Sequence, residues 1–137
     1  MIVTAAFLFI SCIWCHIVDD YVLQGCLANL KQRDWWKFQI AEKMRMDLKD
    51  TMYSNDYIMG LICHSMSWAF TIMIPLIWCR HDTLGFYVIA FCINAPVHAI
   101  VDHLKANAHW INLVEDQCIH FIQVFLTVFL WMMLVYR

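Results

Sequence analysis

Glycine, proline and charged side chains are scarce in this chain. Its 137 residues include three Gly and two Pro, and only 15% of them are charged, against about 25% in soluble globular domains. This scarcity excludes a Gly/Pro-rich fibrous chain and a highly charged disordered one. The formal net charge is −2, so the basic excess of a large nucleic-acid interface is lacking as well.

Hydrophobic residues make up 63% of the chain, and its mean hydropathy is +0.61. A bilayer core about 30 Å thick requires about 20 mainly apolar residues in a helix. Helices are favoured because backbone exposed to lipid must satisfy its own hydrogen bonds. We therefore predict an all-α bundle in one domain, residues 1–137, with four transmembrane helices over residues 1–23, 57–79, 84–105 and 113–136.

The distribution of Lys and Arg predicts the orientation of these spans. Lys105 follows the third span, whereas Arg80 and Arg137 lie on the opposite side. The connection between the first two spans holds six further basic residues, which are Lys31, Arg33, Lys37, Lys43, Arg45 and Lys49. The positive-inside rule then places this long connection in the cytoplasm and both termini outside.

The same connection carries an apolar residue at every fourth position, at Trp36, Ile40, Met44 and Leu48. This spacing predicts a short helix that lies on the membrane surface. A solvated helical hairpin is the alternative interpretation.

The spans also carry ionisable residues, each of which costs about 2.5–3.5 kcal/mol in hydrocarbon and therefore needs a partner. Three pairs of His and Asp are spaced four residues apart, which places both members on one helix face. By the helical rise, the imidazoles lie about 10 Å and the carboxylates about 5 Å from the cytoplasmic helix ends. The residues concerned are His16 with Asp20, His98 with Asp102, Asp116 with His120, and the additional His64.

Four imidazoles and three carboxylates are too many for one tetrahedral ion and suit two divalent ions. Mixed His/Asp ligation favours Zn²⁺, with Mn²⁺ or Fe²⁺ as alternatives. We predict as metal ligands His16, Asp20, His64, His98, Asp102, Asp116 and His120. Gln24, Lys105 and Gln117 are expected to orient these ligands or a substrate. A polar network that only holds the helices together is the structural alternative.

Two motifs, H-x-x-x-D-Y-x-L-Q from His16 to Gln24 and D-Q-x-x-H from Asp116 to His120, bracket most of the chain. Together with His64, His98, Asp102 and Lys105, they resemble the domain-of-unknown-function 3307 family of small bacterial and phage membrane proteins. The resemblance implies a bacterial inner membrane, or a host membrane if the chain is phage-encoded. More distantly, the pattern is similar to membrane-bound metal-dependent hydrolases and to the helical zinc phospholipase C and P1 nuclease group.

These features together predict a metal-dependent hydrolase, specifically a phosphoesterase that acts at the cytoplasmic interface on a phospholipid or a nucleotide. The catalytic carboxylates would be Asp20, Asp102 and Asp116, beside ions that lower the pKa of a bound water. One alternative is a transporter or channel for metal ions or protons, which requires relay residues in the outer halves of the spans, where the sequence is almost wholly apolar. Another is a non-enzymatic phage or bacterial membrane protein that binds a partner, and a homo-oligomer stays open.

The seven cysteines are odd in number and lie mostly in apolar runs. We interpret them as reduced residues that pack like small hydrophobic side chains. Cys12, Cys15 and His16 also form C-x-x-C-H, the pattern of covalent haem attachment. Haem is disfavoured, because the motif lies within an apolar helix and would leave the aspartates of the spans unexplained.

Overall fold

The computed structural model describes residues 2–42, 53–80 and 82–136, and within them the regular structure is helical. Four segments are long and apolar enough to cross a membrane, which are Ala5–Leu23, Asp56–Cys79, Leu84–Ala106 and Leu113–Val135. The all-α fold with four spans is therefore confirmed, and each boundary agrees with the prediction to within a few residues.

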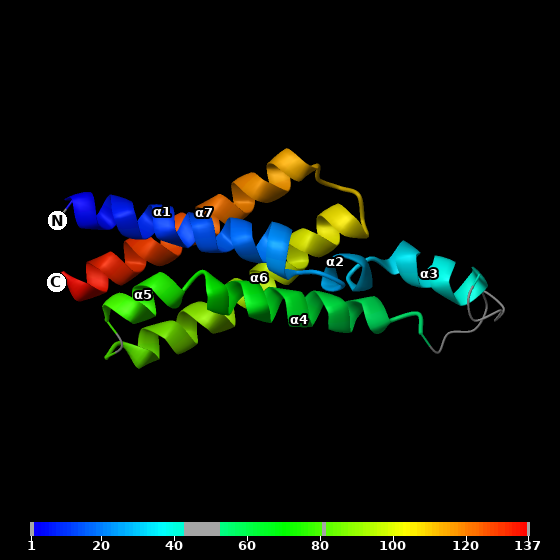
Figure 1. Cartoon of the computed structure of the whole chain (residues 1–137), viewed down its shortest axis with the longest axis horizontal. Coiled ribbons are helices and arrows are strands. Elements are labelled where there is room, and N and C mark those ends of the chain that lie inside the picture. Colours follow the sequence, from blue (N-terminus) through cyan, green and yellow to red (C-terminus); the bar gives the residue numbers. More distant parts are fainter. Residues whose placement is uncertain (1, 43–52, 81, 137) are drawn as a thin grey trace.

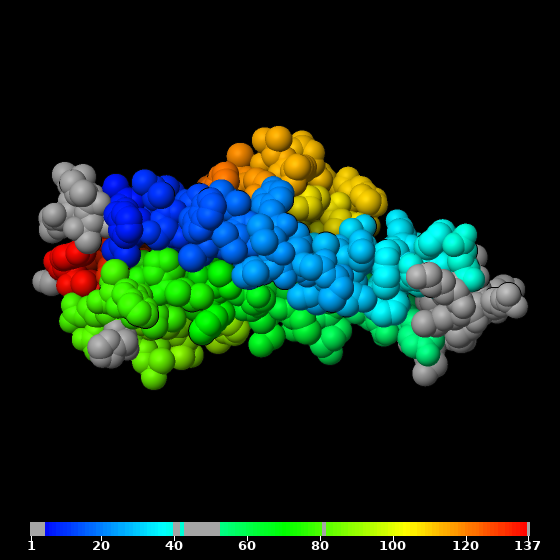
Figure 2. All heavy atoms as spheres, viewed as in Figure 1, coloured from blue at the N-terminus to red at the C-terminus, as the bar shows by residue number. Residues whose placement is uncertain are grey.

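The helices run roughly along the long axis of the molecule, with both chain ends at one end of the bundle and α3 at the other (Figure 1). The first helix, α1 (Ile2–Val18), packs against α7 (Leu113–Val135), and α4 (Asp56–Thr71) packs against α6 (Leu84–Ala106). Figure 2 shows α1 lying over α4 on one face. The alternating topology matches the prediction, whereas the side that faces the cytoplasm stays a prediction.

The first span changes its helical form before it ends. Residues Asp19–Leu23 form a π-helix (η1), in which Gln24 N donates to Asp19 O at 3.0 Å. A π-turn is wider than an α-turn, because its hydrogen bonds join residues five apart. Two consecutive side chains, Asp19 and Asp20, are buried here, although they would point to different directions in a regular α-helix.

The second span is divided in two. Helix α4 ends at Thr71, and α5 (Ile74–Cys79) follows with Pro75 in its first turn. Proline has no N–H to donate, and its ring clashes with the carbonyl four residues earlier, which is that of Thr71. The break at this position therefore follows from Pro75.

The connection after the first span turns back towards the bundle. Gly25 has a positive φ of 46°, a conformation that glycine adopts without strain. The short helix α2 (Leu27–Leu30) follows, and then α3 (Arg33–Glu42). A helix is thus confirmed around Trp36, but the Ile40 side chain and residues Met44, Leu48, Lys43, Arg45 and Lys49 lie outside the described residues, and the contact of this helix with a membrane surface stays a prediction.

An apolar core fills the half of the bundle nearer the chain ends, around Trp68, Ile72, Leu76 and Trp131. Large apolar side chains also cover the outside, as expected for a surface that faces lipid. All seven cysteines are free, which agrees with the prediction. Only Cys12 among them is buried, so most of these thiols lie on the outer surface and do not pack in the core.

Candidate metal centre

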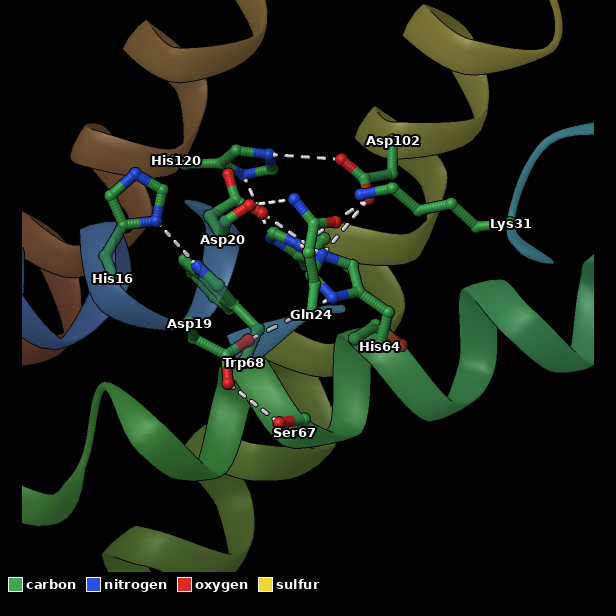
Figure 3. A network of polar contacts seen from close by, with 12 residues as sticks. His16, Asp19, Asp20, Gln24, Lys31, His64, Ser67, Trp68, Asp102 and His120 are labelled. Carbon is green, nitrogen blue, oxygen red and sulfur yellow. Dashed lines mark hydrogen bonds and ion pairs between the residues drawn. The ribbon is translucent and has the colours of Figure 1, made fainter. Parts of the chain in front are cut away.

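Side chains from all four spans meet in a buried cluster (Figure 3). Two overlapping groups have ligand atoms that lie within 4.8 Å of one another, and both include His98. The first group is Asp20, His64 and His98, and the second is His98, Asp102 and His120. Five of the seven predicted ligands therefore come together, and each is at most 4% exposed.

His64 Nε2 is the centre of the first group. It lies 3.1 Å from Asp20 Oδ1 and 3.1 Å from His98 Nε2. Asp102 Oδ2 is 3.4 Å from the same nitrogen. A single imidazole nitrogen of α4 thus faces one carboxylate from η1 and both a carboxylate and an imidazole from α6.

Three buried acceptor atoms in and beside the second group have no hydrogen-bond partner, namely His120 Nε2 and Asp102 Oδ1 of the group and Asp116 Oδ1 next to it. His120 Nε2 lies 3.6 Å from the Asp102 oxygen and 3.4 Å from the Asp116 oxygen. The other nitrogen, His120 Nδ1, lies 3.1 Å from Gln123 Oε1, an acceptor that keeps the ring proton on Nδ1. The lone pair of His120 Nε2 then faces two carboxylate oxygens in a buried site, which requires either a proton or a cation between the nitrogen and these oxygens.

His98 lies between the two groups. Its Nε2 faces His64, and its Nδ1 lies 3.1 Å from His120 Nδ1. The ring of Trp68 stacks on it, with ring centroids 4.1 Å apart and planes 18° from parallel. His98 can therefore offer one nitrogen to either group while Trp68 holds its plane.

His16 contacts the cluster indirectly. Trp68 Nε1 donates to His16 Nδ1 at 2.7 Å, and because an indole nitrogen only donates, the proton of His16 resides on Nε2. That nitrogen lies 3.0 Å from Gln117 Oε1. Both nitrogens are engaged, so His16 orients Gln117 in this arrangement and offers no lone pair to an ion or a haem iron; its part as a direct ligand stays a prediction.

Gln117 connects two of the predicted catalytic carboxylates. Its Nε2 donates to Asp20 Oδ2 at 3.1 Å and to Asp116 Oδ2 at 3.0 Å. An amide in this position can orient both carboxylates, and its role towards a metal stays a prediction. Gln24 behaves differently, since its amide donates to the backbone carbonyl of Asp20 while its own Oε1 is buried without a partner.

Two lysines neutralise part of the negative charge. Lys105 Nζ lies 2.6 Å from Asp116 Oδ2 and 4.0 Å from Asp102 Oδ1, in agreement with its predicted place. Lys31 Nζ lies 2.6 Å from Asp102 Oδ2 and is 8% exposed, although the sequence argument counted it only as a loop charge. Gly25, whose positive φ marks a turn at the start of this connection, was the sequence signal that could have revealed it.

Lys31 is held over the cluster through its backbone. Asn107 Nδ2 donates to Lys31 O at 3.0 Å, and Asn107 Oδ1 accepts from Arg33 N at 2.6 Å. On the neighbouring helix, Asn112 caps α7 by accepting from Val114 N and Glu115 N. Both loops at this end of the bundle are therefore fixed close to the aspartates.

Asp19 is a second residue that the sequence argument left out, because regular α-helical spacing directs it away from the shared face. Its Oδ1 accepts from Ser67 Oγ at 2.7 Å and from Thr71 Oγ1 at 3.2 Å. Its Oδ2 lies 4.0 Å from His64 Nδ1, and both of these buried atoms lack a hydrogen-bond partner. With a cation in the cluster, a carboxylate behind Nδ1 would hold the ring proton of His64 there and leave the lone pair of Nε2 for the ion.

No protein-family model, curated protein or solved structure matches this chain. The resemblance to the domain-of-unknown-function 3307 family thus rests on the motifs alone.

Proposed function

We propose that this protein is a membrane-embedded, metal-dependent hydrolase that cleaves a phosphoester at one membrane interface. The observation that carries the proposal is the buried nitrogen His120 Nε2, which has no hydrogen-bond partner and lies within 3.6 Å of two carboxylate oxygens, Asp102 Oδ1 and Asp116 Oδ1, that have none either. Tetrahedral zinc with bonds of about 2.0–2.2 Å places neighbouring ligands about 3.3–3.6 Å apart. The distances around His120 Nε2 fall in this range.

The charges of the cluster support a divalent cation. The cluster holds four buried carboxylates, Asp19, Asp20, Asp102 and Asp116, and two ammonium groups, of which Lys31 pairs with Asp102 and Lys105 with Asp116. With neutral imidazoles, two negative charges remain, which is a costly state in a low-dielectric interior. Imidazole and carboxylate ligands suit Zn²⁺ best and also bind Mn²⁺ or Fe²⁺, and the two groups that share His98 suit a pair of ions.

The arrangement also provides the parts that phosphoester hydrolysis needs. A bound divalent cation would supply a water of lowered pKa and would polarise the phosphoryl oxygens. Asp102 lies between the two groups, with one oxygen towards His64 and the other towards His120, and is placed to accept a proton from such a water. Lys105, whose side chain is 25% exposed, is placed to stabilise negative charge on the phosphoryl group.

Metal content tests the first part of the proposal. The protein is purified in detergent without chelators, and its metals are quantified by mass spectrometry. We expect one or two zinc ions per chain, and fewer than about half an ion in the His98→Ala/His120→Ala double variant, which removes ligands of both groups. His109→Ala, at an exposed histidine, is the matched control. Wild-type protein with less than half an ion, unchanged in the double variant, would overturn the metal centre.

Activity tests the second part. Metal-loaded protein is assayed on bis(4-nitrophenyl) phosphate and on phospholipid vesicles, before and after a chelator and with zinc returned. We expect turnover that the chelator abolishes and zinc restores. Protein that holds its metal and hydrolyses neither phosphoester would contradict the hydrolase.

One observation favours the transporter alternative. The outer halves of the spans are less uniformly apolar than the sequence indicates, because Asn94, Gln123 and Thr127 are buried beyond His120, and Trp131 Nε1 donates to Tyr87 OH at 2.9 Å further along. Within residues 2–42, 53–80 and 82–136, no hydrogen bond joins these two sets, so the polar path is interrupted. Zinc uptake into proteoliposomes, set against hydrolysis, distinguishes the two functions.

A further inference from the structure

A groove runs between α6 and α7, beginning one helical turn from the metal centre. It encloses about 260 Å³. Ile89 and Ile93 on its walls are 62% and 59% exposed, so the groove is open to the surface that faces lipid. Its apolar lining comprises Phe86, Ile89, Ile93, Val97, Leu126 and Leu130.

The floor of the groove is polar, which is unusual for a surface in hydrocarbon. Asn94 Nδ2 donates to Thr127 Oγ1 at 2.9 Å, and Gln123 Nε2 lies 3.3 Å from Asn94 Oδ1. Gln123 also carries the hydrogen bond to His120. Gln123 therefore links the floor of the groove to the metal centre by hydrogen bonds.

Along this pair of helices the chemistry changes in a fixed order. The apolar groove comes first, then the amides Asn94 and Gln123, then the His/Asp groups, and finally Lys105 at the end of α6. A lipid phosphate has the same order, with a hydrocarbon chain, a polar linkage and an anionic headgroup. Apolar burial and charge complementarity thus both favour a lipid phosphate whose hydrocarbon chain lies in the groove and whose headgroup points to the His/Asp groups.

We propose that this groove binds the hydrocarbon chain of a membrane lipid with a phosphate headgroup, and that this lipid is the substrate. The phosphate would lie at the His/Asp groups beside Lys105, and the linkage at the amides. The assignment of the substrate rests on the proposed function, whereas the binding of the lipid does not. In the reaction, a water oxygen bonds to phosphorus, the P–O bond to the lipid alcohol breaks, one proton passes to that alcohol, and the other is released.

The length of the groove constrains the length of the hydrocarbon chain that can occupy it. The helix from Phe86 to His98 rises about 18 Å at about 1.5 Å per residue, which exceeds half of a bilayer core about 30 Å thick. A chain that follows the groove from the metal centre must therefore cross the middle of the bilayer. A single long chain, such as a polyprenyl chain, fits this requirement better than a short one.

Two tryptophan substitutions on α6 test the groove. Ile93 lines it and Ile100 does not, yet both side chains are 59% exposed, so Ile93→Trp fills the groove while Ile100→Trp adds the same bulk elsewhere. A long-chain polyprenyl phosphate is added to purified protein in detergent, and bound lipid is measured by native mass spectrometry. We expect one lipid per chain in wild type and Ile100→Trp, and about tenfold weaker binding in Ile93→Trp. Unchanged metal content in Ile93→Trp verifies its fold.

The outcomes separate this proposal from the hydrolase. Equal lipid binding by all three proteins would overturn the groove site, as would a wild type that binds and hydrolyses a nucleotide but retains no lipid phosphate. Lipid binding in the expected pattern without phosphate release would support the site and contradict the hydrolase. Lipid binding with phosphate release would support both.

Discussion

Gly60 of α4 packs directly against the backbone of Leu30 in α2. A Cβ at position 60 would lie 2.6 Å from the carbonyl carbon and oxygen of Leu30 and 2.8 Å from Lys31 N. Helix α2 can therefore approach α4 only because residue 60 has no side chain. This approach carries Lys31 to Asp102.

We expect Gly60→Ala to push α2 away from α4 and to destabilise the protein by about 1–3 kcal/mol, as overpacking does elsewhere. The readout is thermal unfolding in detergent, followed by tryptophan fluorescence. Gly85→Ala is the control, since a Cβ there meets nothing within 4 Å and alanine is a better helix former by up to about 1 kcal/mol. Equal melting temperatures for wild type and Gly60→Ala would show that α2 does not rest on α4.

Replacing Lys31 by methionine should leave the Asp102 carboxylate buried without its ammonium partner. Loss of one member of a buried ion pair costs about 3–5 kcal/mol, so metal-free Lys31→Met should unfold at a clearly lower temperature. Zinc should restore much of this loss, because it binds only the folded state. Lys37→Met is the control, since Lys37 pairs with Asp34 in an exposed ion pair worth about 0–1 kcal/mol. A Lys31→Met protein as stable as wild type without metal would contradict this role.

The carboxylate of Asp19 should raise the affinity for zinc although it binds no ion itself. In Asp19→Asn the amide can present an N–H towards His64 Nδ1, which disfavours the tautomer with its lone pair on Nε2. We expect zinc affinity to fall about 10–100-fold, measured by competition with a chromophoric chelator, and the ¹⁵N shifts of the His64 ring to report the altered tautomer. Asp34→Asn makes the same chemical change at an exposed site and should bind zinc like wild type. A zinc affinity in Asp19→Asn equal to that of wild type would refute the pairing of Asp19 with His64.

Trp68→Phe should keep an aromatic ring on His98 but remove the hydrogen bond to His16. The buried His16 Nδ1 then loses its donor, at a cost of about 1–3 kcal/mol. The hydrogen bonds that run from His16 through Gln117 to Asp20 and Asp116 should weaken as a result. We expect lower stability together with weaker zinc binding. Trp131→Phe removes a similar bond, from Trp131 Nε1 to Tyr87 OH at 2.9 Å, away from the centre, and should lower stability alone. The hypothesis fails if both variants bind zinc equally well.

Much of the candidate centre could be predicted from spacing. Pairs such as His98 with Asp102 lie four residues apart, and helical geometry fixes that they share a face. The roles within the cluster could not be predicted in this way. His16 and His64 have equivalent positions in the sequence argument, yet Trp68 engages His16 while His64 faces Asp20 and His98.

The positions of two residues in the cluster, Asp19 and Lys31, could not be predicted from the sequence. Asp19 turns inward because the first span ends in a π-turn, which hydrophobic periodicity does not reveal. Lys31 reaches Asp102 because α2 returns over α4, and a count of loop charges places it in solvent. Both depend on contacts between segments that are distant in the chain.

The sequence by itself determined the four long apolar helices and the spacing of the imidazoles and carboxylates along them, because hydrocarbon thickness sets the length of a span and helical rise converts residue number into distance along the axis. Only the tertiary structure decided which of these groups face one another, which of them lysines and amides engage, and which acceptors are left for a cation. Those relations depend on the rotation of each helix and on close contacts such as Gly60 with Leu30, which arise only when the helices pack together.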